Sequence, residues 1–362
     1  MEVSIILPAL NEENSIGQAV SAIHEILRPL AVIYEIIVVD TDSVDKTADI
    51  ARQGGARVIN EPCRGYSNAL RRGFKEAKGR YLIMYDPDGS YDTAALPAMI
   101  DALRAGNDYV NANRFADLTD NSMSFSHVFG NKVINFFGNF FFRASGKDVL
   151  SGFKGLKAET TGKLKLYSQK WDLNMELHAK IRNGRYIFKE IPSRYFARAG
   201  KSKLPGFSAA WDNFRFMIAH APDFFIVGPA AVIMLAAAAG FQLLLLEKSA
   251  PFYYAGFFSM FFISGYSLLL SGILVKRRLS DSGFNGKSML ADLSRHLTIE
   301  RGFWTALIIL FTGLVTAGYT FYLKIITNSW QIKLACLSSA FFMLSIITWG
   351  FSIFNYLTGK NP

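Results

Sequence analysis

Two carboxylates stand one residue apart, directly after an apolar run of the chain. Asp86-Pro87-Asp88 follows residues 81–85, whose apolar side chains predict a buried strand. Open α/β sheets bind ligands beyond the carboxyl ends of their strands, where this pair would lie. Mg²⁺ and Mn²⁺ take carboxylates and waters and usually share the site with substrate phosphates. We therefore interpret Asp86 and Asp88 as metal ligands, with a turn in which Asp bonds its own backbone as the alternative.

Polar segments also follow the first two predicted strands. Residues 8–13 come after the strand at 3–7, and residues 40–47 come after the strand at 34–39. The carboxyl ends of parallel strands meet at one edge of a sheet. We therefore expect these segments and the Asp pair to face a single crevice.

Helix capping is the alternative explanation for some of these polar residues. Asn11 and Asp45 are suited to cap helices. Capping does not account for Asp40, Asp86 and Asp88 together. Three acids would repel an anionic ligand unless a cation lay between them, which favours the metal interpretation.

The N-terminal 220 residues alternate short apolar runs with helical patterns. Strands are predicted at 3–7, 34–39, 57–59, 81–85 and 109–110, and helices at 15–27, 45–51, 66–77 and 94–105. Ser15 and Asp45 are the predicted N-caps of the first two helices. This alternation is typical of an α/β fold with a mainly parallel, doubly wound sheet. The unit is expected to end near Ala221-Pro222-Asp223.

The C-terminal 140 residues predict a membrane domain. Hydrophobic residues form 51% of the 362-residue chain, and four runs contain no charged residue: 224–246, 252–275, 303–323 and 334–357. Each reaches the roughly 20 residues that a helix needs to cross a hydrocarbon core of about 30 Å. We expect an integral membrane protein with a catalytic domain at 1–220 and four helices within 221–362.

Charge placement predicts the orientation. The apolar run at 3–7 is too short for a signal peptide, so the N-terminal half is expected to stay cytoplasmic. The loop between the second and third runs holds Lys276, Arg277, Arg278, Lys287, Arg295 and Arg301. By the positive-inside rule this loop is cytoplasmic, and four spans return the C-terminus to the same side of the plasma membrane or its equivalent.

The net charge of +10 fits such a protein, since cytoplasmic flanks are basic and a basic face binds anionic headgroups. Nucleic acid is not an expected partner, because the aromatic residues lie in the apolar runs rather than among the basic ones. The two cysteines, Cys63 and Cys336, suggest neither a disulfide nor a zinc site.

Four spaced motifs resemble those of family 2 glycosyltransferases of the GT-A fold. They are Pro8/Asn11/Glu12, Val38-Val39-Asp40/Ser43/Asp45/Thr47, the Arg64-Gly65 … Ala69-Leu70-Arg71 … Gly73 segment, and Asp86/Asp88. The resemblance covers the whole N-terminal half. It implies a GT-A catalytic domain that uses a nucleotide sugar and Mg²⁺ or Mn²⁺.

A narrower resemblance is to polyprenyl-phosphate glycosyltransferases, the dolichol-phosphate mannose synthase-like group. It is carried by Asn113-Arg114-Phe115, by Asp148 … Ser151-Gly152-Phe153-Lys154, by Glu190-Ile191-Pro192 with Arg198, Gly200, Ser202, Lys203 and Leu204, and by Thr298-Ile299-Glu300-Arg301-Gly302. It implies inverting transfer of a hexose from a UDP- or GDP-sugar to a dolichyl or undecaprenyl phosphate. A homo-oligomer is left open.

The resemblance assigns roles residue by residue. Donor binding falls to Pro8, Leu10, Asn11, Glu12, Asp40, Thr41, Arg64 and Asp86; acceptor phosphate binding to Arg114, Arg198, Ser202 and Lys203; metal binding to Asp86, Asp88 and Ser90; and catalysis to Asp88, Arg114 and Arg198. A phosphate acceptor is already ionised at neutral pH, so the reaction needs cations rather than a strong base. Guanidinium suits this role because it can donate two parallel hydrogen bonds to phosphate.

Three positions depart from the family pattern. Thr41 stands where many members have a second Asp that helps to hold uracil, and Ser90 stands where the mannose synthase-like members have a Gln of the metal shell. Asn131 falls near the position where some members have a phosphate-binding Arg. The nucleotide base and the metal coordination therefore stay open. Arg114 could instead serve in a structural ion pair, and Arg198 and Lys203 could bind lipid headgroups. Asp148 is expected to stabilise the acceptor loop.

Residues 125–143 carry seven phenylalanines with few charges, which suits either core packing or a helix in the membrane interface. Residues 209–219 could form a second such helix.

Two rival functions remain. One is transfer to the hydroxyl of a lipid-linked sugar, which needs a general base; the Gln-x-x-Arg-Trp motif of processive relatives is absent from the sequence. The other is a scaffold or transport protein with a degenerate transferase domain. Against it, both Asp86 and Asp88 are present and the four runs lack the ionisable residues typical of a polar pathway.

Overall fold

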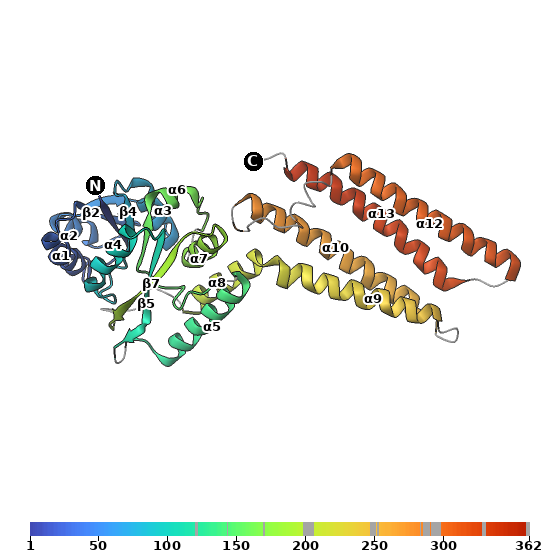
Figure 1. The fold of residues 1–362 in the computed structure, drawn as a ribbon, viewed down its shortest axis with the longest axis horizontal. Helices are drawn as coiled ribbons and strands as arrows, with labels where there is room; N and C mark the ends of the chain where they lie inside the picture. The colour runs from blue at the N-terminus through green and yellow to red at the C-terminus, as the bar shows by residue number, and fades with distance from the viewer. Residues whose placement is uncertain are drawn as a thin grey trace. The chain divides into compact units, whose positions relative to one another are not determined.

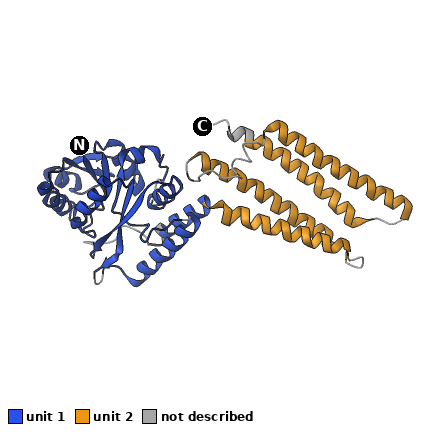
Figure 2. Cartoon of the chain, viewed as in Figure 1, with its two compact units in different colours: residues 1–220 blue, residues 221–362 orange. Residues whose placement is uncertain are grey.

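The computed structural model describes residues 1–119, 122–142, 144–168, 171–197, 206–246, 251, 253–282, 284, 290, 298–327 and 331–359. The chain divides into two compact units, Met1–His220 and Ala221–Pro362 (Figure 2). Arg198, Ser202 and Lys203 lie outside the described residues.

The first unit is built on a seven-stranded sheet with the order β3-β2-β1-β4-β6-β5-β7 (Figure 1). The strands are β1 Val3–Ala9, β2 Tyr34–Asp40, β3 Arg57–Asn60, β4 Tyr81–Met84, β5 Tyr109–Leu118, β6 Lys154–Lys157 and β7 Phe188–Tyr195. Only β6 runs antiparallel to its neighbours among these strands. The predicted fold class, an α/β fold with a mainly parallel sheet, is confirmed.

Helices cover both faces of this sheet, because the strand residues alternate between two apolar clusters. Ile5 and Leu7 of β1 pack in one cluster with helices α1 (Ile16–Leu27) and α4 (Leu96–Arg104). Ile6 packs in the other with α3 (Tyr66–Glu76) and α7 (Leu173–Asn183). The remaining helices of the unit are α2 Thr47–Gln53, α5 Phe125–Phe142, α6 Ala158–Lys163 and α8 Gly206–His220.

Several local predictions were wrong. The strand predicted at 109–110 continues to Leu118, and β6 and β7 were not predicted. Ser15 is at the N-cap of α1 but makes no capping bond, because its hydroxyl donates to the Glu12 carboxylate at 2.9 Å. Lys46 is at the N-cap of α2; Asp45, one residue earlier, still accepts the Thr47 N–H at 3.0 Å.

The second unit contains four helices that are long and apolar enough to cross a membrane. The candidate spans are Asp223–Leu246, Tyr253–Asp281, Ile299–Thr327 and Ile332–Asn355. They comprise a short π-helical turn (Asp223–Val227) and helices α9 Gly228–Leu246, α10 Tyr253–Asp281, α12 Ile299–Thr327 and α13 Ile332–Gly359 (Figure 1). The predicted four apolar spans are therefore confirmed.

Small polar residues join the last two helices. Ser338 of α13 donates to the Gly313 carbonyl of α12 at 2.9 Å, and Ser345 donates to the Ala306 carbonyl at 2.8 Å. A Cβ on Gly313 would lie 3.1 Å from the Phe341 side chain, so the two backbones approach closely. Small residues and interhelical hydroxyl bonds are the usual means of helix association in lipid.

The aromatic helix α5 does not bury its rings as core packing would require. Phe125, Phe129 and Phe136 are 85%, 61% and 65% exposed, and only Phe142 among the seven phenylalanines of the helix is buried. The ring centroids of Phe142 and Phe216 of α8 lie 6.0 Å apart, in an edge-to-face arrangement. Core packing is therefore the wrong interpretation for most of these rings. Placement in a membrane interface stays a prediction.

Gly73 tests the packing of α3 on the sheet. A Cβ at this position would lie 2.3 Å from Cγ2 of Ile6 in β1. We expect Gly73→Ala to lower the free energy of unfolding by about 1–3 kcal/mol through overpacking. Denaturant unfolding of the detergent-solubilised chain measures this. Gly130→Ala is the matched helical control, since its Cβ would meet nothing within 4 Å. Equal stability of both variants would contradict the close approach of α3 to β1.

Candidate active site

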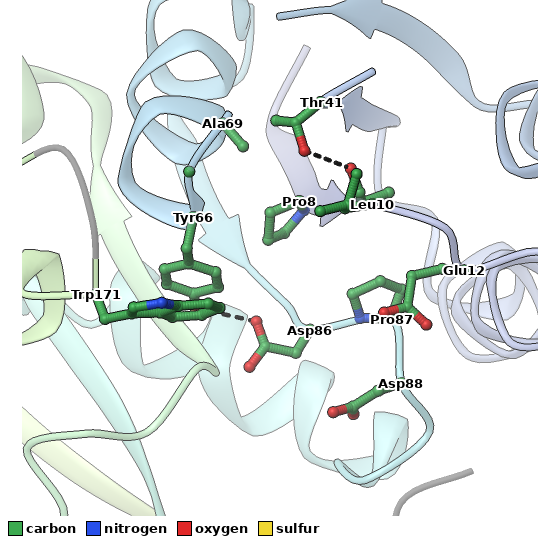
Figure 3. Close-up of a pocket in the computed structure, with 12 residues that line it drawn as sticks. Pro8, Leu10, Glu12, Thr41, Tyr66, Ala69, Asp86, Pro87, Asp88 and Trp171 are labelled. Atoms are coloured by element: carbon green, nitrogen blue, oxygen red, sulfur yellow. Dashed lines mark hydrogen bonds between the residues drawn. The ribbon is translucent and has the colours of Figure 1, made fainter. Parts of the chain in front are cut away.

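The loops after β2, β1 and β4 meet because these strands are neighbours in the sheet. They form a pocket with the start of α3 and one residue preceding α7 (Figure 3). Its lining consists of Pro8, Ala9, Leu10, Glu12, Thr41, Gly65, Tyr66, Ala69, Asp86, Pro87, Asp88 and Trp171. Six of the predicted site residues therefore share one pocket: Pro8, Leu10, Glu12, Thr41, Asp86 and Asp88.

The two carboxylates of the pocket are held by different partners. Oδ1 of Asp86 accepts a hydrogen bond from the Tyr66 hydroxyl at 2.9 Å (Figure 3). Oδ1 of Asp88 accepts from the Ser90 N–H at 3.0 Å and from the Ser90 hydroxyl. Ser90 is fully buried. Its hydroxyl proton is thus directed at Asp88, which makes support of that carboxylate its visible role.

Two aromatic residues of the pocket were missed by the sequence reasoning. The Tyr66 and Trp171 rings stack with centroids 5.1 Å apart and planes 22° apart. Burial, followed by the nearby Asp86 carboxylate, raises the pKa of Tyr66 well above its usual value. Its hydroxyl therefore stays protonated and acts as a donor. The aromatic residue after Gly65 was a weak signal for Tyr66, whereas no pattern in the sequence pointed to Trp171.

Asn11 and Asp40 support the loops and are not among the residues that line the pocket. Asn11 has a left-handed backbone (φ 51°), and its side-chain oxygen accepts the Val44 N–H at 2.9 Å. Asp40 accepts the Ser43 N–H at 3.3 Å and also the Ser43 hydroxyl. The Asn11 bond ties the loop after β1 to the loop after β2, and the Asp40 bonds hold the loop after β2 in its turn. Asn11 does not cap a helix, and its predicted contact with the donor stays a prediction.

Thr41 and Arg64 are placed differently. The Thr41 hydroxyl donates to the Ala9 carbonyl at 3.1 Å, which fixes its side chain at the pocket wall (Figure 3). Arg64 lies on the surface beside Gly65 and contacts the Asp42 carboxylate at 3.2 Å. Such an exposed ion pair contributes little to stability, so the Arg64 guanidinium is easily drawn to another anion.

Arg114 forms a buried, bidentate ion pair with Asp148. Nε and Nη2 of Arg114 donate to the two carboxylate oxygens at 2.7 and 2.8 Å, and its backbone N–H donates at 2.9 Å. Burial alone would lower the pKa of Arg114, but the charge and hydrogen bonds of Asp148, together with Tyr91 and Tyr195, outweigh it, and the pKa lies well above its usual value. This geometry favours the structural ion-pair interpretation of Arg114; its contact with an acceptor phosphate stays a prediction.

A second polar layer fixes the loop at 148–153. Nζ of Lys154 donates to the Asn111 side chain at 2.7 Å and to the Val149 carbonyl at 3.0 Å. The Asn111 amide donates to the Asp148 carbonyl at 2.8 Å. Burial lowers the pKa of Lys154 to about 7. The loop that follows Asp148 is therefore bonded through side chains of β5 and β6.

The donor set suits a cation that shares its site with a phosphate ligand. Within the described ranges, no group of three or more His, Cys, Asp or Glu residues could hold a metal by itself. The pocket instead offers the Asp86 and Asp88 carboxylates, and Mg²⁺ typically binds one or two carboxylates plus waters and substrate phosphates. The residues present thus fit Mg²⁺ or Mn²⁺ bound together with a phosphate ligand.

The sequence is similar to known transferases. Residues 4–163 match the family model described as Glycosyl transferase family 2. The chain is 29% identical over 231 residues to the low-salt glycan biosynthesis hexosyltransferase Agl6 of Haloferax volcanii, covering 63% of this chain and 55% of that protein. It is 30% identical over 227 residues to a dolichol-phosphate mannosyltransferase of Pyrococcus furiosus, covering 57% of this chain and 60% of that protein. The chain thus spans little more than half the length of these relatives.

One further relative and one solved structure are also similar to this chain. A dolichyl-phosphate hexose transferase of Haloferax volcanii is 27% identical over 207 residues, covering 57% of this chain and 88% of that protein. Among solved structures, glucosyl-3-phosphoglycerate synthase from Mycobacterium tuberculosis in complex with Mg²⁺ and uridine diphosphate has a TM-score of 0.48 at 19% identity, covering 61% of this chain and 79% of that chain.

The Arg114–Asp148 pair leads to a stability prediction. Asp148→Ala leaves a buried guanidinium without its counter-charge, which is expected to cost about 3–5 kcal/mol of unfolding free energy. Denaturant unfolding in detergent measures the loss. Asp49→Ala is the control, because its ion pair with Arg52 is exposed and is expected to matter little. If the two variants were equally stable, the ion pair would not hold this part of the fold.

Proposed function

We propose that this chain, a glycosyltransferase whose residues 4–163 form a family 2 domain, moves a hexose from a nucleotide sugar to a polyprenyl phosphate at a membrane. The observation that carries the proposal is the meeting of Asp86 and Asp88 with the loops after β1 and β2 in one pocket. Relatives named as dolichol-phosphate mannosyltransferase and dolichyl-phosphate hexose transferase support the choice of acceptor.

On the donor side, Pro8, Leu10, Glu12 and Thr41 would contact the nucleotide, with Arg64 drawn from the surface to a phosphate. Asn11 and Asp40 would act by holding these loops in place. Asp86 and Asp88 would hold Mg²⁺ or Mn²⁺, which when bound supplies Lewis-acid stabilisation of the leaving diphosphate. Ser90 would orient Asp88 through the hydrogen bonds that it already makes.

On the acceptor side, the lipid phosphate carries its own negative charge and attacks without a strong base. Cationic side chains must therefore bind it and direct its oxygen at the sugar carbon. Arg114, Arg198, Ser202 and Lys203 are the proposed ligands. Of these, Arg114 would have to share its guanidinium between Asp148 and the phosphate. A single displacement would invert the sugar carbon.

The membrane features suit a lipid acceptor. The second unit has four helices able to span a bilayer, and α5 of the first unit exposes Phe125, Phe129 and Phe136. Exposed aromatic rings on a helix are suited to the headgroup boundary, where the phosphate of a polyprenyl lipid lies. By the positive-inside rule, the catalytic domain and both termini are proposed to be cytoplasmic.

A second candidate is transfer to the hydroxyl of a lipid-linked sugar, which the similarity to a glycan biosynthesis hexosyltransferase supports. This reaction would need a general base beside the acceptor hydroxyl. One experiment separates the two reactions: membranes that contain the chain are incubated with radiolabelled UDP- and GDP-sugars and polyprenyl phosphate, and the lipids are extracted. A labelled polyprenyl phosphate-sugar supports the first. Label found only in a larger lipid-linked glycan supports the second.

Asp88 tests the donor site. Asp88→Ala is expected to reduce transfer about 100-fold or more, because a metal contributes several kcal/mol to stabilising the leaving group. Radiolabel in the extracted lipid measures the rate. Asp101→Ala, at an exposed site on α4, is the matched control and should transfer normally. Full activity of Asp88→Ala in a folded protein would disprove its assignment as a metal ligand.

Arg198 tests the acceptor site. Arg198→Ala is expected to raise the KM for polyprenyl phosphate about 10- to 100-fold, because hydrogen bonds to a charged group contribute about 1.5–3 kcal/mol. The KM for the nucleotide sugar should change much less. Steady-state kinetics with each substrate varied in turn provides both values, and Arg52→Ala on α2 serves as the control. Equal loss for both substrates would instead indicate a structural role.

A further inference from the structure

The structure assigns Tyr66 and Gly152 as positioning residues that hold the carboxylate of Asp86 from two sides. The assignment rests on the proposed function, in which Asp86 binds the metal and the donor. It goes beyond the aspartate pair itself, because it concerns the residues that give this carboxylate a fixed direction.

Tyr66 supplies the first side of this support. Its hydroxyl donates to Oδ1 of Asp86 at 2.9 Å from the first turn of α3. The ring that carries the hydroxyl is stacked on Trp171, so its orientation is set by packing (Figure 3). A hydrogen bond from a residue that is itself held in place restricts the rotamers of the carboxylate.

Gly152 supplies the second side. A Cβ at this position would lie 1.9 Å from Oδ2, 2.5 Å from Cγ and 2.9 Å from Oδ1 of Asp86. No side chain therefore fits at position 152 while Asp86 keeps its present direction. The backbone of Gly152 therefore limits the positions that the Asp86 carboxylate can take on this side.

Gly152 can restrict the Asp86 carboxylate because its own loop is held in place by other contacts. The Gly152 N–H donates to the Tyr91 hydroxyl. The Tyr91 ring packs edge-to-face against Phe153, with ring centroids 5.8 Å apart. At the start of the same loop, Asp148 is paired with the buried Arg114. Contacts thus run from the proposed acceptor residue Arg114, through the loop, to the proposed donor residue Asp86.

Asp88 provides an internal comparison. It is held by Ser90, two residues away in its own turn. Asp86 depends on residues 20 positions earlier and 66 positions later in the sequence. Substitutions at Tyr66 and Gly152 should therefore disturb one carboxylate of the pair and leave the support of the other intact.

The test measures metal-dependent nucleotide binding by the full-length chain in detergent. Binding of UDP and of GDP is followed by calorimetry while Mn²⁺ is varied. Tyr66→Phe removes the hydroxyl and keeps the ring on Trp171. We expect the Mn²⁺ concentration for half-maximal binding to rise about 10- to 100-fold, as is usual when a partner of a metal ligand is lost. Gly152→Ala should have at least as large an effect.

Matched controls separate positioning from general damage. Among the described residues, Tyr109→Phe removes a buried hydroxyl that has no hydrogen-bond partner, and Gly162→Ala adds a methyl group that would meet nothing within 4 Å. Both should bind as the wild type does. Thermal unfolding identifies a variant that has lost its fold. If Gly152→Ala does not fold, Tyr66→Phe decides the question by itself.

The outcomes distinguish this inference from the proposed function. An unchanged Mn²⁺ requirement in a folded Tyr66→Phe protein would overturn the positioning role, whether or not the wild type makes a lipid product. A raised requirement, in a protein that transfers no sugar to polyprenyl phosphate, would support the positioning role and reject the proposed acceptor. A wild type that binds neither nucleotide with Mn²⁺ would overturn both.

Discussion

The loops around the pocket of the first unit depend on the buried ion pair between Arg114 and Asp148. Removing two charges from water is costly, and the cost is offset only when the pair is close and its other polar atoms are bonded. Here the carboxylate receives two bonds from the guanidinium and one from the backbone, and Asn111 bonds the Asp148 carbonyl. The pair thereby ties the loop at 148–153 to β5.

This tie has consequences at the pocket, because the loop brings Gly152 against Asp86. The pocket is therefore built from two kinds of support. The edge of the parallel sheet brings the loops after β1, β2 and β4 together, and Ser90 orients Asp88 within its own turn. Asp86 is oriented by α3 and by the loop before β6, which are far apart in the sequence. A carboxylate supported in this way can keep one direction before any ligand arrives, which is what preorganisation of a binding site requires.

The sequence predicted those parts of the fold that local patterns determine. Apolar runs followed by polar segments located β1, β2 and β4 and the Asp pair, and charge-free runs located the four spans. Short strands such as β6 have no distinctive pattern, because their hydrogen bonds come from partners far away in the chain. Tyr66, Trp171 and Gly152 could not be assigned for the same reason, since their roles follow from tertiary contacts. A structural ion pair of Arg114 was predicted only as an alternative, and Asp148 was not identified as its partner, because an arginine in a motif does not reveal its counter-charge.

The exposed rings of α5 and the four apolar helices are both consistent with the proposed lipid acceptor. A water-soluble acceptor would require neither, and exposing Phe125, Phe129 and Phe136 to water would be unfavourable. A polyprenyl phosphate has an apolar tail that stays in the bilayer and an ionised head that needs cations. Each unit carries apolar surface suited to lipid, and the catalytic unit adds a pocket suited to a nucleotide diphosphate with its cation. The proposed lipid phosphate acceptor would account for all of these features, whereas a scaffold function would not account for the supported carboxylates of Asp86 and Asp88.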